Sequence, residues 1–191
     1  MKLFIHIPKN GGISIKTVLQ EKYFYPFDGH YTCQQMKAKS ILNNFTYEEI
    51  FSTCRNPFSR MVSVYFLLQH KMKSYSHYFD NLDLTIPFKY YSFRHFVEFF
   101  LKQNNLNFHY MNTYMFLPQH TWLDTSDNVK IFKIEEINKI EKYLNCKMPH
   151  HNKHLYEKPW MNLYDEESKK IVYTHYEKDF ETFKYLKNIP I

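Results

Sequence analysis

Short apolar runs along the chain alternate with longer stretches in which apolar residues recur at helical spacing. The runs at residues 3–7, 49–54 and 129–134 predict buried strands. In the stretches between them, apolar residues recur every three or four positions, which is typical of one face of a helix. Strands that alternate with helices in this order predict an α/β fold with a small central parallel sheet, in which helix exceeds strand.

The expected helices are marked by start signals as well as by their spacing. Thr32 and Ser92 precede apolar-periodic stretches as N-cap residues do, and Pro57 suits the first turn of a helix. The stretch 73–91 has no clear period and contains Pro87, so we expect an irregular insertion there. The sequence thus predicts helices at 13–22, 33–43, 58–71, 93–102, 135–144 and from about 165 onward.

Length and composition limit the classes of protein to which the chain can belong. At 191 residues it suits a single domain, residues 1–191, with a substantial core. The net charge of +6 fits an anionic ligand, but Lys and Arg are dispersed along the chain, which argues against a nucleic-acid partner.

The cysteines and the lengths of the apolar runs indicate the compartment. Cys33, Cys54 and Cys146 share no C-x-x-C spacing, which argues against a disulfide framework and suits a reducing environment. No apolar run reaches the roughly 20 residues that cross a bilayer. Because the first expected strand starts at residue 2 or 3, we expect no signal peptide and a cytoplasmic protein.

The first candidate site is the turn between the first expected strand and the helix after it. Glycines let backbone N–H groups approach an oxyanion, a helix start adds partial positive charge, and Lys9 supplies a full one. The order differs from a Walker A sequence, because Lys9 precedes the two glycines. The turn is either an ordinary junction or an anion cradle made of Pro8, Lys9, Asn10, Gly11, Gly12, Ile13 and Ser14.

The second candidate site follows the second expected strand, which ends at Cys54. Arg55 at the carboxyl end of this strand can form a bidentate pair with a phosphate, and Ser63 can donate a hydroxyl hydrogen bond. Both can reach one phosphate only if the helix starts soon after the strand. Arg60, on the same helix, either supports that phosphate or makes a structural ion pair.

Together the two segments resemble a known enzyme family. The order Pro-Lys-x-Gly-Gly-x-Ser from Pro8 is similar to the 5′-phosphosulfate loop of sulfotransferases that use 3′-phosphoadenosine 5′-phosphosulfate (PAPS). The order Arg-x-Pro-x-x-Arg-x-x-Ser-x-Tyr from Arg55 resembles the 3′-phosphate motif of the same family. The Phe-Ile-His-Ile start looks most like its carbohydrate enzymes, including heparan sulfate 6-O-sulfotransferase. Later segments also resemble the family: 116–123, 131–137, 151–153 and 173–185.

The resemblance implies a P-loop-kinase-like α/β sandwich and sulfuryl transfer from PAPS to an acceptor hydroxyl, with 3′-phosphoadenosine 5′-phosphate (PAP) as product. It implies that His30 is the base and that Lys9 stabilises the leaving phosphate, without a metal. It also suggests a donor contact from Lys153. His6, inside the first strand, is expected to be a core residue instead.

For several other segments the sequence leaves two interpretations open. His120 and Trp122 either contact the acceptor, with the indole stacked on a sugar ring, or are a surface histidine near a buried tryptophan. The insertion 73–91 either borders the acceptor cleft or is only a loop. Three histidines lack ligand partners at metal-site spacing and favour a loop near the nucleotide over a metal centre: His150, His151 and His154.

Other functions remain compatible with the same residues. A small-molecule or nucleotide kinase of the same fold would be favoured by a complete Walker A sequence, which is absent. A catalytically inactive glycan-binding protein would keep the fold and show no transfer. For an active enzyme, a glycan hydroxyl is the expected acceptor, and a lipid-linked sugar, a protein tyrosine or a small metabolite are the other candidates.

Overall fold

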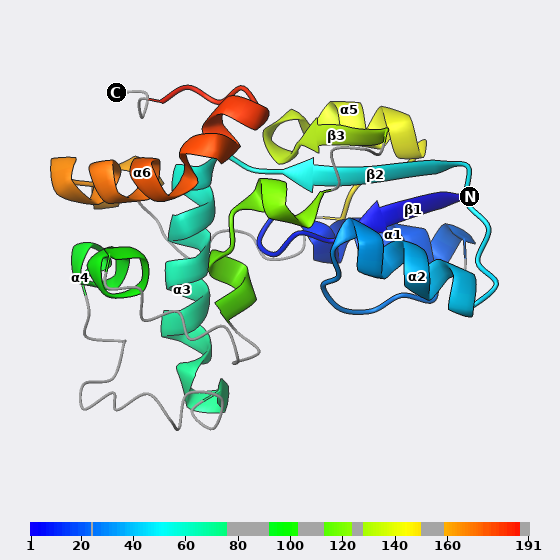
Figure 1. Cartoon of the computed structure of the whole chain (residues 1–191), viewed down its shortest axis with the longest axis horizontal. Coiled ribbons are helices and arrows are strands. Elements are labelled where there is room, and N and C mark those ends of the chain that lie inside the picture. Colours follow the sequence, from blue (N-terminus) through cyan, green and yellow to red (C-terminus); the bar gives the residue numbers. More distant parts are fainter. Residues whose placement is uncertain (24, 76–91, 103–112, 124–127, 150–158, 188–191) are drawn as a thin grey trace. The chain divides into compact units, whose positions relative to one another are not determined.

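The structure is a computed structural model of the whole chain, and it describes residues 1–23, 25–75, 92–102, 113–123, 128–149 and 159–187 (Figure 1). Its strands are β1 (Lys2–Ile5), β2 (Glu49–Cys54) and β3 (Val129–Lys133). Its α-helices are α1 (Gly12–Tyr23), α2 (Cys33–Leu42), α3 (Pro57–Tyr75), α4 (Phe93–Val97), α5 (Ile137–Leu144) and α6 (Glu166–Thr182). A π-helical turn, η3 (Glu98–Lys102), and four 3-10 turns complete the described elements: η4 (Thr113–Phe116), η5 (Gln119–Trp122), η6 (Ile134–Glu136) and η7 (Trp160–Leu163).

The predicted α/β class is confirmed, with a small parallel sheet and more helix than strand. The predicted start signals are also found. The Thr32 hydroxyl accepts the Gln35 N–H in a capping box, and the Ser92 hydroxyl accepts the His95 N–H. Pro57 is the first residue of α3.

The structure differs from the sequence prediction in three of the helices. Helix α3 continues to Tyr75, so the start of the expected insertion is helical, while residues 76–91 lie outside the described part. The expected helix 93–102 changes from α to π geometry at Glu98, a change that apolar spacing over one turn does not reveal. The expected helix 135–144 opens with the 3-10 turn η6.

The sheet has the order β1-β2-β3, with both pairs parallel. The carboxyl ends of the strands therefore meet at one edge, where the loops after Ile5, Cys54 and Lys133 begin. Helix α2 contacts β1, and α5 contacts β3 (Figure 1). The core around the sheet buries apolar side chains from these elements: Leu3, Ile5, Ile15, Leu19, Met36, Phe51, Ile140 and Leu144.

Residue contacts divide the chain into two compact units, and each unit is made of two separate segments. The first unit contains residues 1–55 and 119–153, and so holds the whole sheet. The second contains residues 56–118 and 154–191, with α3, α4 and α6. The expectation of a single domain stays a prediction.

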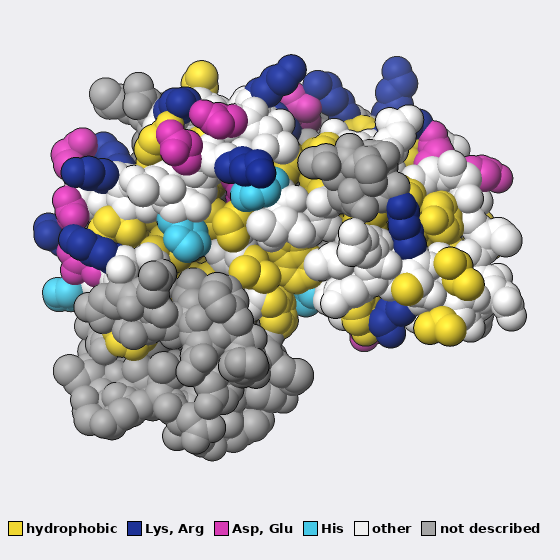
Figure 2. Space-filling model, in the orientation of Figure 1, with side chains coloured by type: hydrophobic (Ala, Val, Ile, Leu, Met, Phe, Trp, Pro, Cys, Tyr) yellow, Lys and Arg dark blue, Asp and Glu magenta, His cyan; other side chains and the backbone are white. Residues whose placement is uncertain are grey.

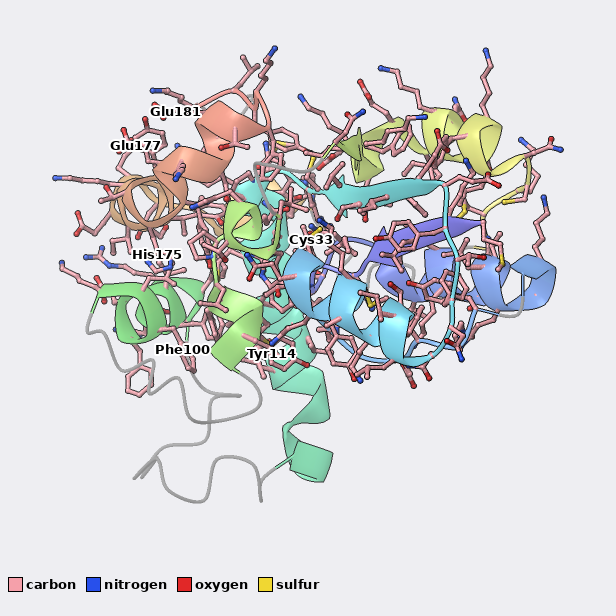
Figure 3. The ribbon with its side chains drawn as sticks, turned by 45° about the vertical axis from the view of Figure 1, so that its right-hand side comes forward. Cys33, Phe100, Tyr114, His175, Glu177 and Glu181 are labelled. Atoms are coloured by element: carbon pink, nitrogen blue, oxygen red, sulfur yellow. The ribbon has the colours of Figure 1, made fainter. Side chains whose placement is uncertain are left out.

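Aromatic side chains dominate the core of the second unit. The rings of Phe100, which Figure 3 labels, and Phe116 stack with their centroids 4.5 Å apart. Phe96 packs against Phe100 with the ring centroids 4.9 Å apart. Stacked and tilted aromatic pairs of this kind stabilise a fold by more than the burial of their apolar area alone.

Arg60 is a buried structural residue of the second unit. Only 1% of it is exposed, and its guanidinium donates to the Leu117 oxygen at 3.0 Å and to the Met115 oxygen at 2.9 Å. The pKa of Arg60 is lowered because the residue is buried. The nearby Tyr176 and Asp179 oppose this shift. These contacts support the structural interpretation of Arg60 over a role in the phosphate site.

A charged cluster joins the strands at the opposite edge of the sheet from their carboxyl ends. Glu49 of β2 forms salt bridges with Lys2 of β1 and Lys130 of β3, and it accepts the Tyr143 hydroxyl at 3.0 Å. The Lys2 ammonium also lies 3.9 Å from the centre of the Tyr143 ring. Hydrogen bonds from Lys130, Lys2 and Tyr143 lower the pKa of Glu49 to about 2.

No helix within the described residues is long and apolar enough to span a membrane.

We predict that Glu49→Gln lowers the unfolding midpoint at neutral pH. The difference from wild type should shrink as the pH is lowered. Because the pKa of Glu49 in the folded protein lies below its ordinary value of 4.5, its stabilising effect is complete above pH 4.5 and is lost as pH falls toward 2. Thermal or urea unfolding of both proteins across this range measures the difference.

Glu48→Gln is the matched control, because Glu48 is the exposed neighbour and its carboxylate makes a weak pair with the amino terminus at 3.6 Å. Its effect on the midpoint should be small. A difference between wild type and Glu49→Gln that stays constant from pH 7 to pH 2 would contradict the role given to the carboxylate.

Candidate functional site

The loop after β1 contains two residues with left-handed backbone geometry just before the start of α1. Lys9 and Gly11 both have positive φ angles, 67° and 76°. This region is costly for a lysine, so the surrounding contacts must hold Lys9 in place. The first turn of α1 contains no acidic residue, and the Ile15 N–H makes the first helical bond, to the Gly11 oxygen at 3.4 Å. The amides that precede Ile15 are the ones that a helix start offers to an anion.

A buried hydrogen-bond network fixes this loop against β2. Asn10 has no exposed surface, and its Nδ2 donates to the Thr53 oxygen at 2.8 Å and to Gln119 Oε1 at 2.7 Å. In return, Thr53 Oγ1 donates to the Asn10 oxygen at 2.8 Å. These buried hydrogen bonds hold the loop in one conformation.

Arg55 lies at the same edge of the sheet as the loop. Its Nη1 donates to the Lys9 oxygen at 3.3 Å, so the guanidinium is next to the backbone of the lysine. Its N–H donates to Gln119 Oε1, and its carbonyl oxygen accepts from Gln119 Nε2, both at 2.9 Å. Two cationic residues that the sequence separates are thus brought together at the ends of two adjacent parallel strands.

His30 and His6 form a pair of imidazoles near this loop. Their ring centroids are 4.0 Å apart, and His30 Nδ1 lies 2.9 Å from the His6 carbonyl oxygen. A carbonyl oxygen only accepts hydrogen bonds, so Nδ1 carries the hydrogen. The lone pair of the neutral ring is then on Nε2.

The surroundings of both histidines favour the neutral form. Burial lowers the pKa of His30 below 6.5, and the charges of Lys16 and Lys9 add to this, while the hydrogen bond to His6 and the Asp28 carboxylate oppose it. Burial, followed by the charges of His30 and Lys16, lowers the pKa of His6 to about 3. His30 is therefore suited to accept a proton at neutral pH.

The ring of His6 occupies the space beside the start of α1. A Cβ atom built on Gly12 would lie 1.8 Å from His6 Cδ2, closer than any real contact. Gly12 therefore lets the imidazole pack directly on the helix backbone. His6 Nδ1 is buried and has no hydrogen-bond partner among the described residues. The expected core position of His6 is thus next to the loop, where it contacts both Gly12 and His30.

Trp122 and His120 lie on η5 in the same unit. Trp122 is only 4% exposed, and its ring meets that of His30 edge-on with the centroids 6.3 Å apart. This arrangement favours a buried tryptophan that supports His30 over an open surface for a sugar ring. His120 is half-buried.

The structure does not place Ser63 or Lys153 with this group. Ser63 is half-buried on α3 and belongs to the second unit. Lys153 lies outside the described residues, as do His150, His151 and His154.

Thr53 and Gln119 are residues of the site that the sequence pattern did not assign. Thr53 is the penultimate residue of a buried strand, and glutamine is most often exposed, so neither suggests a buried polar contact. The position of Gln119 after Pro118 was the only available signal. No sequence signal marks the role of the His6 carbonyl, because every residue has a backbone carbonyl.

The described residues show a mixed charged surface on one face and a cavity in the second unit. On the face shown in Figure 2, Lys and Arg side chains of the described residues lie among Asp and Glu. A cavity of about 310 Å³ in the second unit contains none of the predicted site residues. Its lining residues are Leu101, Lys102, Glu167, Lys170, Ile171, Thr174 and His175, the last of which Figure 3 labels on α6.

Comparisons of the chain with protein-family models, curated proteins and solved structures found no match.

We predict that Gly12→Ala destabilises the fold by about 1–3 kcal/mol, because the new methyl group overlaps the His6 ring. In a His6→Ala background the overlap is absent. There the same substitution should be neutral or stabilise by up to about 1 kcal/mol, as alanine does in a helix.

The four proteins of this double-mutant cycle can be compared by urea unfolding. The diagnostic result is that Gly12→Ala lowers the free energy of unfolding in the wild-type background but not in the His6→Ala background. Equal destabilisation by Gly12→Ala in both backgrounds would show that the His6 ring does not fill this space.

Proposed function

We propose that the protein is a sulfotransferase that moves a sulfuryl group from PAPS to an acceptor hydroxyl. The observation that carries the proposal is the meeting of the Lys9 loop and Arg55 at one edge of the sheet, joined by the hydrogen bond from Arg55 Nη1 to the Lys9 oxygen. Open α/β sheets bind ligands at the carboxyl ends of their strands. Two anion-binding groups at that edge suit a donor with phosphates at both its 5′ and 3′ positions.

The donor groups present fit such a ligand. The start of α1 offers backbone amides, its first turn lacks a competing carboxylate, and Lys9 and Arg55 add full charges. The sequence motif adds Ser63 as a further 3′-phosphate ligand. Bound PAPS would supply an activated sulfuryl group on a phosphate leaving group.

His30 is the proposed base. Its Nδ1–H is held by the His6 carbonyl oxygen, which orients the ring and keeps the lone pair on Nε2. Nε2 takes the proton of the acceptor hydroxyl as the hydroxyl oxygen forms its bond to sulfur. The lowered pKa of His30 keeps this nitrogen unprotonated at neutral pH.

Lys9 and the loop amides act on the leaving side. As the bond from sulfur to the bridging oxygen breaks, the electron pair stays on that oxygen, and the Lys9 ammonium balances the new negative charge. The charge of Lys9 contributes to lowering the pKa of His30, so the two groups are electrostatically linked. Lysine and amides thereby supply what Mg²⁺ supplies in kinases.

The P-loop-kinase-like fold and the carbohydrate acceptor are part of the same proposal. A parallel sheet with an anion loop directly after its first strand supports the fold. The likeness of the first strand to the carbohydrate branch supports a glycan hydroxyl as the acceptor.

We predict that the protein binds PAP, and that Arg55→Ala weakens this binding by about 10- to 100-fold, because charge-assisted hydrogen bonds to the 3′-phosphate are lost. Isothermal titration calorimetry measures both affinities. ATP with Mg²⁺ should bind more weakly than PAP.

Arg94→Ala is the matched control, since it removes an exposed arginine of the second unit that pairs with Glu98 and Asp165. Its affinity for PAP should equal that of wild type. Tighter binding of Mg²⁺–ATP than of PAP would favour the kinase over the sulfotransferase.

We predict that the acidic limb of the pH–rate profile lies below pH 6.5 and moves in opposite directions in two variants. Activity requires neutral His30 and is lost as pH falls through its lowered pKa. Lys16→Met removes a charge that lowers this pKa, so the limb should move to higher pH. Asp28→Asn removes a carboxylate that raises it, so the limb should move to lower pH.

The variants suit this comparison because Lys16 and Asp28 form a salt bridge with each other, and neither is proposed to contact the reacting groups. His30→Ala should lower kcat by about 10²- to 10⁴-fold and remove the limb. Shifts of the same sign in both charge variants would assign the limb to another group.

A further inference from the structure

The side chain of Gln119 pairs with the backbone of Arg55 as a neighbouring strand would. One amide group of Gln119 donates to the Arg55 oxygen and accepts from the Arg55 N–H, both at 2.9 Å. Arg55 directly follows the last residue of β2. The amide therefore extends ordered hydrogen bonding past the end of the strand to the residue that carries the guanidinium.

The same amide also holds the loop after β1. Gln119 Oε1 accepts from Asn10 Nδ2 at 2.7 Å, so this one oxygen receives hydrogen bonds from both loops. The orientation of the amide is fixed, because the Arg55 N–H requires an acceptor and the Arg55 oxygen requires a donor. Gln119 has no exposed surface, so water does not compete for these bonds.

The contacts of Gln119 reinforce the direct bond from Arg55 Nη1 to the Lys9 oxygen, and together they set the spacing between the two cationic segments. Asn10 is the neighbour of Lys9, and its own bonds to Thr53 tie the loop to β2 but do not reach Arg55. Among the described contacts, Gln119 is the side chain that bonds to both Asn10 and Arg55. Loss of its amide would leave each segment folded while loosening the distance between them.

We propose that Gln119 is a positioning residue, which holds the Lys9 loop and Arg55 at the separation that lets one nucleotide bind through two phosphates at once. This inference rests on the proposed function. Two anion-binding segments at a fixed distance bind a doubly phosphorylated ligand far more tightly than either phosphate alone, because the second contact is made without a new loss of freedom. A loosened distance removes this advantage and leaves each single contact intact.

The test compares wild type with Gln119→Met, which keeps the length and volume of the side chain and removes all three hydrogen bonds. Three nucleotides serve as probes. PAP carries both phosphates, AMP carries only the 5′-phosphate, and 3′-AMP carries only the 3′-phosphate. In Gln119→Met the Kd for PAP should rise by about 10- to 100-fold. The Kd values for AMP and 3′-AMP should change by less than about threefold.

Tyr25→Phe is the matched control. The Tyr25 hydroxyl also bonds to both backbone groups of one strand residue, donating to the Phe4 oxygen at 2.9 Å and accepting the Phe4 N–H at 3.2 Å. It is buried in the same unit, and its hydroxyl bonds to a residue inside β1 and to neither of the two loops. Tyr25→Phe should lower the unfolding midpoint and leave all three Kd values as in wild type. Equal weakening of the three probes in Gln119→Met, or no weakening, would overturn the proposal.

Amide hydrogen exchange separates this inference from the proposed function. In Gln119→Met, exchange should speed up both at Arg55 and in residues 9–12, and in Tyr25→Phe it should not. If exchange changes in this way but wild type binds none of the three nucleotides, the coupling by Gln119 stands and the sulfotransferase proposal fails. If residues 9–12 exchange as in wild type, the coupling is overturned, whatever the nucleotides do.

Discussion

The candidate site depends on a small set of buried amide hydrogen bonds at the carboxyl ends of β1 and β2. Asn10 and Gln119 have no exposed surface, and between them they bind Thr53 and both backbone groups of Arg55. Each bond in water would contribute little, but burial makes each unmade bond costly. The network therefore defines one arrangement of the loops, including a lysine with a left-handed backbone.

A second constraint on the loop and on His30 comes from His6. The His6 ring fills the space that a side chain at Gly12 would need, and the His6 carbonyl holds Nδ1 of His30. The residue directly after β1 thus shapes the helix start through its ring and orients a proposed base through its backbone. Burial and the charge of Lys16 lower the pKa of both histidines, which favours the neutral state that a base requires.

Much of the fold could be predicted from the sequence, because strands, helix starts and the α/β class follow from apolar spacing and capping residues such as Thr32 and Ser92. The π-helical turn after Val97 could not, since apolar spacing does not separate α from π geometry over one turn. Within the site, Lys9, Arg55 and His30 were identified by residue type and position. The contacts of Gln119, Thr53 and the His6 carbonyl connect residues far apart in the chain, and only the folded structure shows them.

The central claim is that this edge of the sheet transfers a sulfuryl group. It is tested most directly by incubating the protein with PAPS that carries radiolabelled sulfate and a panel of glycans, phenols and alcohols. The account predicts that label moves to a hydroxyl-bearing acceptor, with glycans preferred, and that Lys9→Ala abolishes the transfer while remaining folded. Absence of labelled product from every acceptor, with folded wild-type protein, would contradict it.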